Sequence, residues 1–172
     1  MNKIKNLLNI LKNFITLKNN LLLIFISVIF FFDRLSKIKI IKLQLENNSK
    51  LFINEYLNFD LVWNTGIGFG LFNLEASIAY HLISLFIFVI ILILIYLMIK
   101  SDNFERFSYS LLLGGAIGNF YDRINYFAVP DFIDFHINNY HWFTFNIADI
   151  FITIGIIFLM LNELIFKKYE KK

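Results

Sequence analysis

The sequence contains no cysteine and a single proline, and only 17% of its 172 residues are charged. Without cysteine, the chain forms no disulfide, offers no thiolate to a metal and carries no lipid on a cysteine side chain. Its hydrophobic content is 58%, whereas soluble domains are typically about 45–50% apolar. The excess lies in long runs, so the composition indicates a protein whose solvent is the lipid bilayer.

The charge balance is mildly basic, with a formal net charge of +3. The basic residues cluster near the ends of the apolar runs, a pattern typical of membrane orientation and of contact with lipid headgroups. Nucleic-acid binding would require a basic face with interleaved aromatic residues on a soluble scaffold, and the sequence has none. We therefore predict membrane lipid, and no nucleic acid, as a partner.

Four segments are predicted to cross the membrane as helices, which takes about 20 apolar residues each. One of them has no formal charge, and the other three are interrupted by polar residues near one end. The lysine-rich start resembles a signal peptide, but Phe32 and Asp33 stand where small residues would be needed for cleavage, so we expect an uncleaved first span. The predicted spans are 17–41, 76–99, 107–121 and 145–166.

Both termini are predicted to lie in the cytoplasm. An even number of spans places them on one side, and ten of the sixteen lysines and arginines fall in the two tails and the loop around 100–106. The polar interruptions then all lie at the outer ends of their spans. Because an ionisable residue inside a span is energetically costly, this clustering indicates a functional site near the extracytoplasmic face.

The predicted outer loops, 42–75 and 122–144, are long. Residues 58–64 roughly alternate between polar and apolar, which is the period of a strand, and a glycine-punctuated apolar stretch follows. The expected architecture is a single domain, 1–172. It is an all-α membrane bundle of four transmembrane helices with a small extracytoplasmic β-sheet and a surface segment.

Two features of the spans favour close packing around the outer site. Asp33 and Lys37 are four residues apart on one helix face, which predicts a buried ion pair or a lysine that snorkels to the headgroups. The small residues of 114–118 favour the close approach of a neighbouring helix or of an extended substrate. Asp122 follows on the same helix and could pair with the adjacent Arg123, or each could have a separate partner.

Two further carboxylates have apolar neighbours in the sequence. Asp131 lies in the apolar stretch 129–135, where desolvation would raise its pKa. The alternative is an amphipathic surface segment whose carboxylates, above all Asp134, lie in water. Asp149 stands in the first turn of the fourth span, where a carboxylate suits the helix dipole but also lies at the edge of the hydrocarbon. The residues alone leave open which aspartate performs chemistry.

Other kinds of site are not supported. His136 and His141 lie near aspartates, but their spacing is not that of a helical pair of metal ligands and no HExxH pattern exists, so no metal site is predicted. There is no GxSxG motif and no cysteine nucleophile.

Five blocks of residues follow one another along the chain. They are DRLSK at 33–37, NTGIGF at 64–69, GGAIGNFYDR at 114–123, VPDF at 129–132 and FNIAD at 145–149. In this order they resemble the bacterial lipoprotein signal peptidases, also called signal peptidase II, a family of intramembrane aspartic peptidases. The resemblance covers nearly the whole chain. Three small departures are Arg34 where glutamine is common, Ile67-Gly68 in place of two alanines, and Pro130.

The resemblance implies that Asp131 and Asp149 are the catalytic pair and that Asp134 is not catalytic. It implies a substrate, a prolipoprotein already carrying diacylglycerol on a cysteine, that is cleaved just before that cysteine. It also implies a multi-pass enzyme of the cytoplasmic (inner) membrane that we expect to be monomeric and to need no metal or organic cofactor. The residues implied to bind substrate or support the site are Asp33, Lys37, Asn64, Gly118, Asn119, Asp122, Arg123, Asn146 and Ala148.

Two other classes of protein are weighed against this expectation. A four-span transporter or assembly factor would carry ionisable groups through the membrane depth, but here they gather at one face. A catalytically inactive relative that only binds lipoproteins is disfavoured, because both positions of the pair and all supporting positions are occupied.

Overall fold

The structure is a computed structural model that describes residues 17–47, 50–66, 78–138 and 140–166. It contains helices α2 (Leu17–Asn47), α3 (Ile78–Lys100), α4 (Asn103–Tyr126) and α5 (Ile147–Leu161), which continues into the π-helical turn η2 (Asn162–Phe166). The strands are β1 (Leu51–Asn54), β2 (Leu57–Asn64), β3 (Val129–Ile137) and β4 (Tyr140–Phe145). The prediction of a mostly helical protein with a small sheet is confirmed.

Helices α2, α3, α4 and α5 lie where the four spans were predicted, with changes at their ends. Helix α2 continues to Asn47, and α4 continues past Asp122 and Arg123, which were expected in the loop 122–144. Helix α5 begins only at Ile147, because Asn146 caps it and Phe145 belongs to β4. The N-cap side chain accepts a hydrogen bond from the first turn, which satisfies a backbone N–H that has no partner within the helix.

Two of the described segments, Tyr80–Lys100 and Ile147–Ile165, are long and apolar enough to cross a bilayer. Only 11% of the first and 17% of the second is buried inside the protein, so their apolar side chains face outward. A soluble protein would bury such a helix, and this exposure is the arrangement expected in lipid. Helices α2 and α4 carry buried ionic residues instead.

The sheet is antiparallel with the order β1-β2-β3-β4. A strand was predicted at 58–64, and β2 covers it. The sequence did not indicate that 129–137 pairs with β2 or that 140–145 pairs with 129–137 as the next strand. Asp131 and Asp134 on β3 are 2% and 3% exposed, so the alternative of a surface segment with its carboxylates in water is wrong. Ile40 of α2 packs against Phe132 and Ile133, which joins β3 to the helices.

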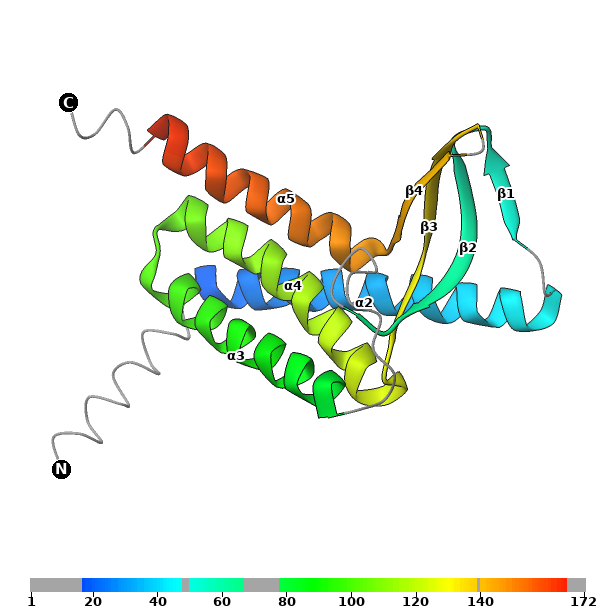
Figure 1. Cartoon of the computed structure of the whole chain (residues 1–172). Helices are drawn as coiled ribbons and strands as arrows, with labels where there is room; N and C mark the ends of the chain where they lie inside the picture. Colours follow the sequence, from blue (N-terminus) through cyan, green and yellow to red (C-terminus); the bar gives the residue numbers. More distant parts are fainter. Residues whose placement is uncertain (1–16, 48–49, 67–77, 139, 167–172) are drawn as a thin grey trace, which may run out of the picture.

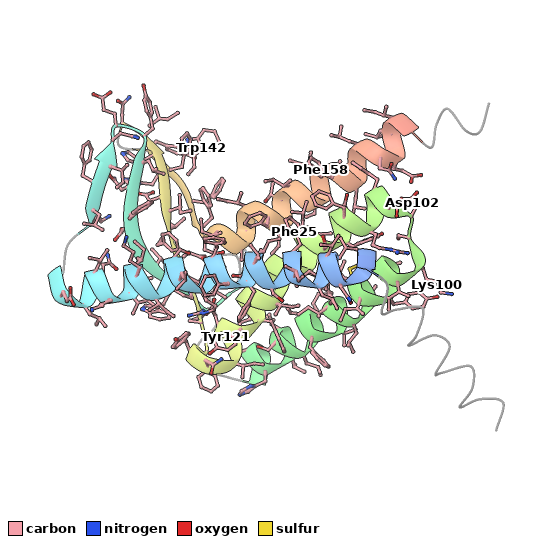
Figure 2. The ribbon with its side chains drawn as sticks, turned by 180° about the vertical axis from the view of Figure 1, so that it is seen from behind. Phe25, Lys100, Asp102, Tyr121, Trp142 and Phe158 are labelled. Carbon is pink, nitrogen blue, oxygen red and sulfur yellow. The ribbon has the colours of Figure 1, made fainter. Side chains whose placement is uncertain are left out.

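Figure 1 shows the sheet standing at one end of the helix bundle, beside the C-terminal half of α2. The start of α2, the end of α5 and the connection between α3 and α4 lie at the other end. Figure 2, from behind, labels Trp142 on the sheet and Lys100 and Asp102 at the far end of the bundle. The described parts of the chain therefore have two different ends, of which only one carries the sheet.

Helix α4 packs so closely against its neighbours that side chains are excluded at the contacts. A Cβ atom on Gly114 would lie 2.8 Å from the side chain of Ile29 on α2. One on Gly115 would lie 2.4 Å from the backbone carbonyl oxygen of Ala148 on α5. The small residues of 114–118 thus serve helix packing, one of the two roles predicted, and they bring three helices together below the sheet.

Candidate active site

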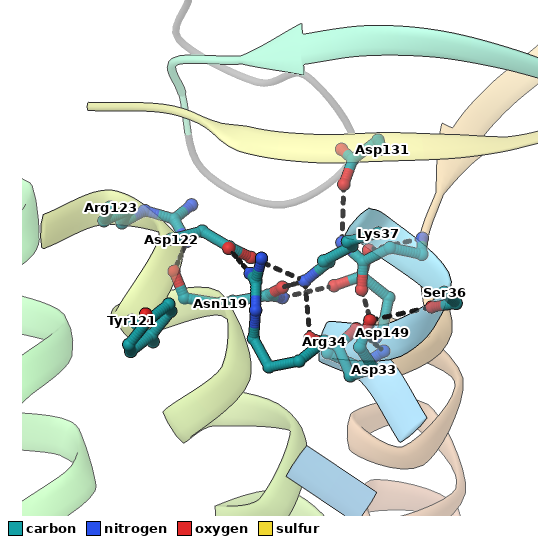
Figure 3. Close-up of polar contacts among 12 residues, drawn as sticks. Asp33, Arg34, Ser36, Lys37, Asn119, Tyr121, Asp122, Arg123, Asp131 and Asp149 are labelled. Carbon is teal, nitrogen blue, oxygen red and sulfur yellow. Dashed lines mark hydrogen bonds and ion pairs between the residues drawn. The ribbon is translucent and has the colours of Figure 1, made fainter. Parts of the chain in front are cut away.

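Lys37 of α2 lies at the centre of a buried group of polar side chains (Figure 3). It is completely buried, and its ammonium donates hydrogen bonds to Asp33 at 2.8 Å, to the Asn119 side-chain oxygen at 2.8 Å and to Asp122 at 2.7 Å. These three bonds use all the donors of the ammonium group. The predicted ion pair of Asp33 with Lys37 is confirmed, and the alternative of a snorkelling lysine is wrong.

Arg34 provides the second cation of this group. Its guanidinium forms an ion pair with Asp122 and lies 5.0 Å from the ring centre of Tyr121 and 5.7 Å from that of Tyr126. Asp33, Arg34, Lys37 and Asp122 together form two anions and two cations, which we call the ionic cluster. Its formal charge is zero, as the burial of charges requires.

Asp33 connects this cluster to α5. One of its carboxylate oxygens accepts the bond from Lys37, and the other accepts a hydrogen bond from the backbone N–H of Ala148 at 3.0 Å. A Cβ atom on Gly118 would lie 2.6 Å from that same carboxylate group. Gly118 and Ala148, predicted as site residues, therefore act by letting α2, α4 and α5 meet at Asp33.

Arg123 does not pair with the adjacent Asp122, so the alternative of separate partners is correct. Its guanidinium donates to the carbonyl oxygen of Gly66 at 2.9 Å and to that of Asn119 at 3.3 Å. Tyr80 of α3 donates in turn to the carbonyl oxygen of Arg123 at 3.0 Å. Arg123 thereby ties the segment after β2 to the end of α4. Residues 67–69, which include the departure at Ile67-Gly68, lie outside the described residues.

Asp149 stands in the first turn of α5, held by a capping box. Its backbone N–H donates to the side-chain oxygen of Asn146, and its carboxylate accepts from the backbone N–H of Asn146, both at 3.1 Å. The other carboxylate oxygen accepts from the side-chain amide of Asn119 at 2.8 Å. Because Asn119 also accepts from Lys37, the ionic cluster orients the amide that orients Asp149.

Asp131 approaches from β3 on the opposite side. Its two carboxylate oxygens accept from the side-chain amides of Asn64, at 2.9 Å, and Asn146, at 2.5 Å. Asn146 therefore contacts both aspartates, Asp131 through its amide nitrogen and Asp149 through its oxygen. A hairpin lies between these two carboxylates along the chain, and the fold brings both of them to the same asparagine.

The surroundings of Asp131 raise its pKa to about 6, from an ordinary value near 3.8. Burial is the main cause, and the neighbouring carboxylate of Asp149 adds to it. The amide hydrogen bonds from Asn64 and Asn146 partly oppose the increase. The predicted rise by desolvation is confirmed, and it means that Asp131 can hold a proton in mildly acidic to neutral solution.

Both aspartates open onto a cavity of about 450 Å³ that continues between the helices. Asn64, Asn119 and Arg123 join them at its polar end. Asp149 also borders a second, apolar cavity of about 340 Å³ between the sheet and α5, lined by Phe135, Phe143 and Phe145 among others. Apart from Thr153, the rest of the larger cavity is apolar and is lined by Ile87, Ile90, Leu94, Leu112, Ala116, Val129, Ile152 and Ile156.

The fold gathers every residue expected at the site around the two aspartates, and it excludes Asp134. That residue is buried in the sheet, against His141. Sequence reasoning missed Arg34, which was noted only as a departure from a pattern, although its charge within a span was a usable signal. It also missed the apolar cavity residues such as Ile87. No sequence signal separates these from their lipid-facing neighbours, because both are apolar residues of one helix.

Two carboxylates share a cavity at one end of an apolar helix bundle, and carboxylates placed in this way can act as a general acid and a general base. The family model for signal peptidase II (SPase II) matches residues 25–165. The chain belongs to the signal peptidase II family and is therefore a peptidase.

Relatives with curated names support this family over most of the chain. A lipoprotein signal peptidase of Pelagibacter ubique is 51% identical over 164 residues, which cover 93% of this chain and 99% of the relative. One from Francisella tularensis is 44% identical, covering 72% and 80%. One from Anaplasma phagocytophilum is 39% identical, covering 83% and 90%.

Solved structures show the same fold. One bacterial membrane enzyme matches with a TM-score of 0.72 and 26% identity, covering 89% of this chain and 92% of its own. Another has a TM-score of 0.67 and 29% identity, covering 86% and 94%. The helices together with the four-stranded sheet are therefore an arrangement already known in membrane enzymes.

Proposed function

We propose that this protein removes signal peptides from diacylglyceryl-modified prolipoproteins, cutting just before the lipidated cysteine, with Asp131 and Asp149 as catalytic residues. The observation that carries the proposal is that these two carboxylates, joined by Asn146, lie at the polar end of one cavity whose wall beyond that end is almost entirely apolar. The names of the relatives and the family membership support the substrate class.

The chemistry follows from the electrostatics of the pair. Two carboxylates close together in a poorly hydrated site share one proton, because ionising both is costly. The ionised partner takes a proton from a water molecule, whose oxygen attacks the scissile carbonyl carbon. The protonated partner donates its hydrogen bond to the carbonyl oxygen and afterwards helps to protonate the leaving amine. The amides of Asn64, Asn119 and Asn146 hold the two carboxylates in position throughout.

The two cavities suit the two apolar parts of such a substrate. The larger one, bounded by α3, α4 and α5, has the apolar wall that the signal segment would need. The smaller one lies on the other side of Asp149, where an acyl chain attached next to the scissile bond would be placed. Because Asp149 borders both cavities, peptide and lipid would diverge at the point of cleavage.

The membrane arrangement is part of this proposal. All four helices span the cytoplasmic membrane as one domain, 1–172, which works as a monomer with both termini in the cytoplasm. The sheet and the two aspartates then lie near the extracytoplasmic face, in contact with lipid headgroups. This is supported by the distribution of basic residues and by the sheet standing at the end opposite to the start of α2 and the end of α5.

The test is to incubate the purified protein with diacylglyceryl-modified and unmodified forms of one prolipoprotein. We expect cleavage of the modified form alone, at the bond before the cysteine, as mass spectrometry of the products would show. The Asp131→Asn variant is the control for a contaminating peptidase. Equal cleavage of both forms would contradict the lipid requirement, and no cleavage of either would contradict the function.

The proposed acyl-chain cavity has its own test. The Ile154→Trp change fills the smaller cavity from α5, and we expect it to raise KM for the modified substrate several-fold because the chain no longer fits. Ile157→Trp is the matched control, since Ile157 on the same helix is 47% exposed and lines neither cavity. An equal effect of both changes would place the acyl chain elsewhere.

A further inference from the structure

The hairpin of β3 and β4 brings two histidines together outside the catalytic site. His136 and His141 are partners in the strand register, and their rings are stacked with centres 5.1 Å apart and planes 21° apart. Their sequence spacing of five excluded a helical pair of ligands, but a hairpin places these two positions opposite each other. The spacing of these histidines therefore does not exclude a metal site built on two strands.

Asp134 completes a cluster of three potential ligands. It lies two residues before His136 on the same strand, so both side chains are on one face of the sheet. Its carboxylate oxygens lie 2.9 and 2.8 Å from Nδ1 of His141, and one lies 3.9 Å from Nδ1 of His136. One ligand atom from each of the three residues lies within 4.8 Å of the other two.

His136 gives an independent reason to expect a ligand here. It is only 7% exposed, and its Nδ1 atom is buried without a hydrogen-bond partner. A buried polar atom normally has a partner, and leaving one unsatisfied is costly. The backbone N–H of His136 donates to the carbonyl oxygen of Tyr56 at 3.0 Å, so the strand is held at this position. The unsatisfied nitrogen faces the carboxylate that His141 already contacts.

We propose that Asp134, His136 and His141 bind a divalent transition-metal ion, with Zn²⁺ as the preferred ion. Two imidazoles and a carboxylate are a zinc ligand set, and water would complete the four-coordinate shell. Tetrahedral zinc with bonds of 2.0–2.2 Å needs ligand atoms about 3.3 Å apart, which lies between the shortest and longest separations in this cluster. The His141 side chain is 49% exposed and provides the route of entry.

The ion would act as a clamp and not as a catalyst. None of the three ligands lines either cavity at the aspartate pair. The ion would join β3 to β4, and β3 also carries Asp131 three residues before Asp134. Because binding requires the folded hairpin, zinc would stabilise the native state. This inference does not depend on the proposed peptidase substrate.

The test is a zinc titration of protein purified without a polyhistidine tag and stripped of metal with a chelator. We expect one Zn²⁺ per chain, measured by competition with a chromophoric chelator, and a higher Tm in zinc than in chelator. His141→Ala and Asp134→Asn should each weaken binding at least about 100-fold, since each removes a direct ligand. His81→Ala is the matched control, because it removes the remaining histidine, which lies on α3.

Two results would overturn the proposal. One is a wild-type protein that takes up no zinc at micromolar concentration. The other is zinc binding by His141→Ala that equals binding by His81→Ala. Circular dichroism and Tm in the presence of chelator establish that each variant is folded. If His141→Ala does not fold, His141→Gln replaces it, since glutamine keeps a polar side chain at the half-exposed position.

Discussion

The ionic cluster and the pair of aspartates lie side by side but are built differently. In the ionic cluster, each carboxylate contacts a cation, and the four formal charges cancel. Asp131 and Asp149 instead accept hydrogen bonds from the neutral amides of asparagines and from a backbone N–H. These neutral donors do not cancel the charge of a carboxylate, so burial and the neighbouring carboxylate of Asp149 still raise the pKa of Asp131.

This difference assigns a role to each group. Buried ion pairs between residues of different helices hold those helices together. The ionic cluster holds α2 against α4 and α5 through Asp33 and Lys37. Asp131 and Asp149 form no ion pair among the described residues and lie next to a cavity, which is the arrangement that the proposed proton transfer requires. Asn119 contacts both Lys37 and Asp149, so the cluster orients Asp149 through this asparagine.

The largest effect is expected from changing the aspartates themselves. Asp131→Asn or Asp149→Asn should lower kcat for lipidated prolipoprotein by about 10³-fold, because each removes a proton-transfer group. Asp122→Asn should lower it less than tenfold per folded molecule, measured as single-turnover cleavage. Asp60→Asn, on β2 and paired with Lys50, is the matched control. An equal loss of activity in Asp122→Asn and Asp149→Asn would contradict the different roles given to the ionic cluster and to the aspartate pair.

Removing the central cation should destabilise the fold strongly. Lys37→Met leaves two buried carboxylates without their ammonium partner, and we expect a loss of about 3–5 kcal/mol in the free energy of unfolding. Lys50→Met provides the comparison, since the Lys50 side chain is 61% exposed in its ion pair with Asp60 and should cost less than about 1 kcal/mol. Both are measured by denaturant titration in mixed micelles. Equal losses of unfolding free energy in the two variants would mean that the ionic cluster does not hold the helices together.

The pH dependence tests the aspartate pair. The pKa of Asp131 is about 6, so kcat/KM should fall by about tenfold per unit as the pH rises above this value and the shared proton is lost. The same raised pKa means that the folded state binds this proton more tightly than the unfolded chain. That contribution, about 3 kcal/mol, is fully present below pH 3.8 and disappears as the pH rises through 6. A flat activity profile between pH 5 and 8 would contradict the pairing.

The smallest effect is expected at the contact between α4 and α5. Gly115→Ala places a methyl group against the backbone oxygen of Ala148, next to Asp149, and should cost about 1–3 kcal/mol and also lower kcat. Gly114→Ala meets the side chain of Ile29 on α2 and should lower the Tm without lowering kcat. Thermal unfolding and cleavage assays on both variants separate packing from positioning. A reduced kcat in Gly114→Ala alone would reverse this assignment.

Much of the fold could be predicted because bilayer-sized apolar runs are local features. The helix positions followed from hydropathy, and β2 followed from the alternation in 58–64. Strand β3 could not be predicted, because 129–135 is largely apolar on both faces. Such a run shows no alternation of polar and apolar residues that would indicate a strand. Only the structure shows that β2 pairs along one edge of β3 and that α2 packs against one face. The end of α4 was placed too early for a related reason, since Asp122 and Arg123 look like loop residues until their buried partners are known.

The sequence by itself determined that the chain is apolar enough for a membrane, that its polar residues gather at one end of the helices, and that it resembles one peptidase family. Composition and motif order carry this information without any contact between distant residues. Only the tertiary structure decided which carboxylates are neutralised and which are not. Asp122 and Asp149 both stand at helix ends beside apolar residues, and the difference between them is a lysine from α2 and an asparagine from α4. Asp134 and two histidines likewise became a candidate metal site only when the hairpin closed.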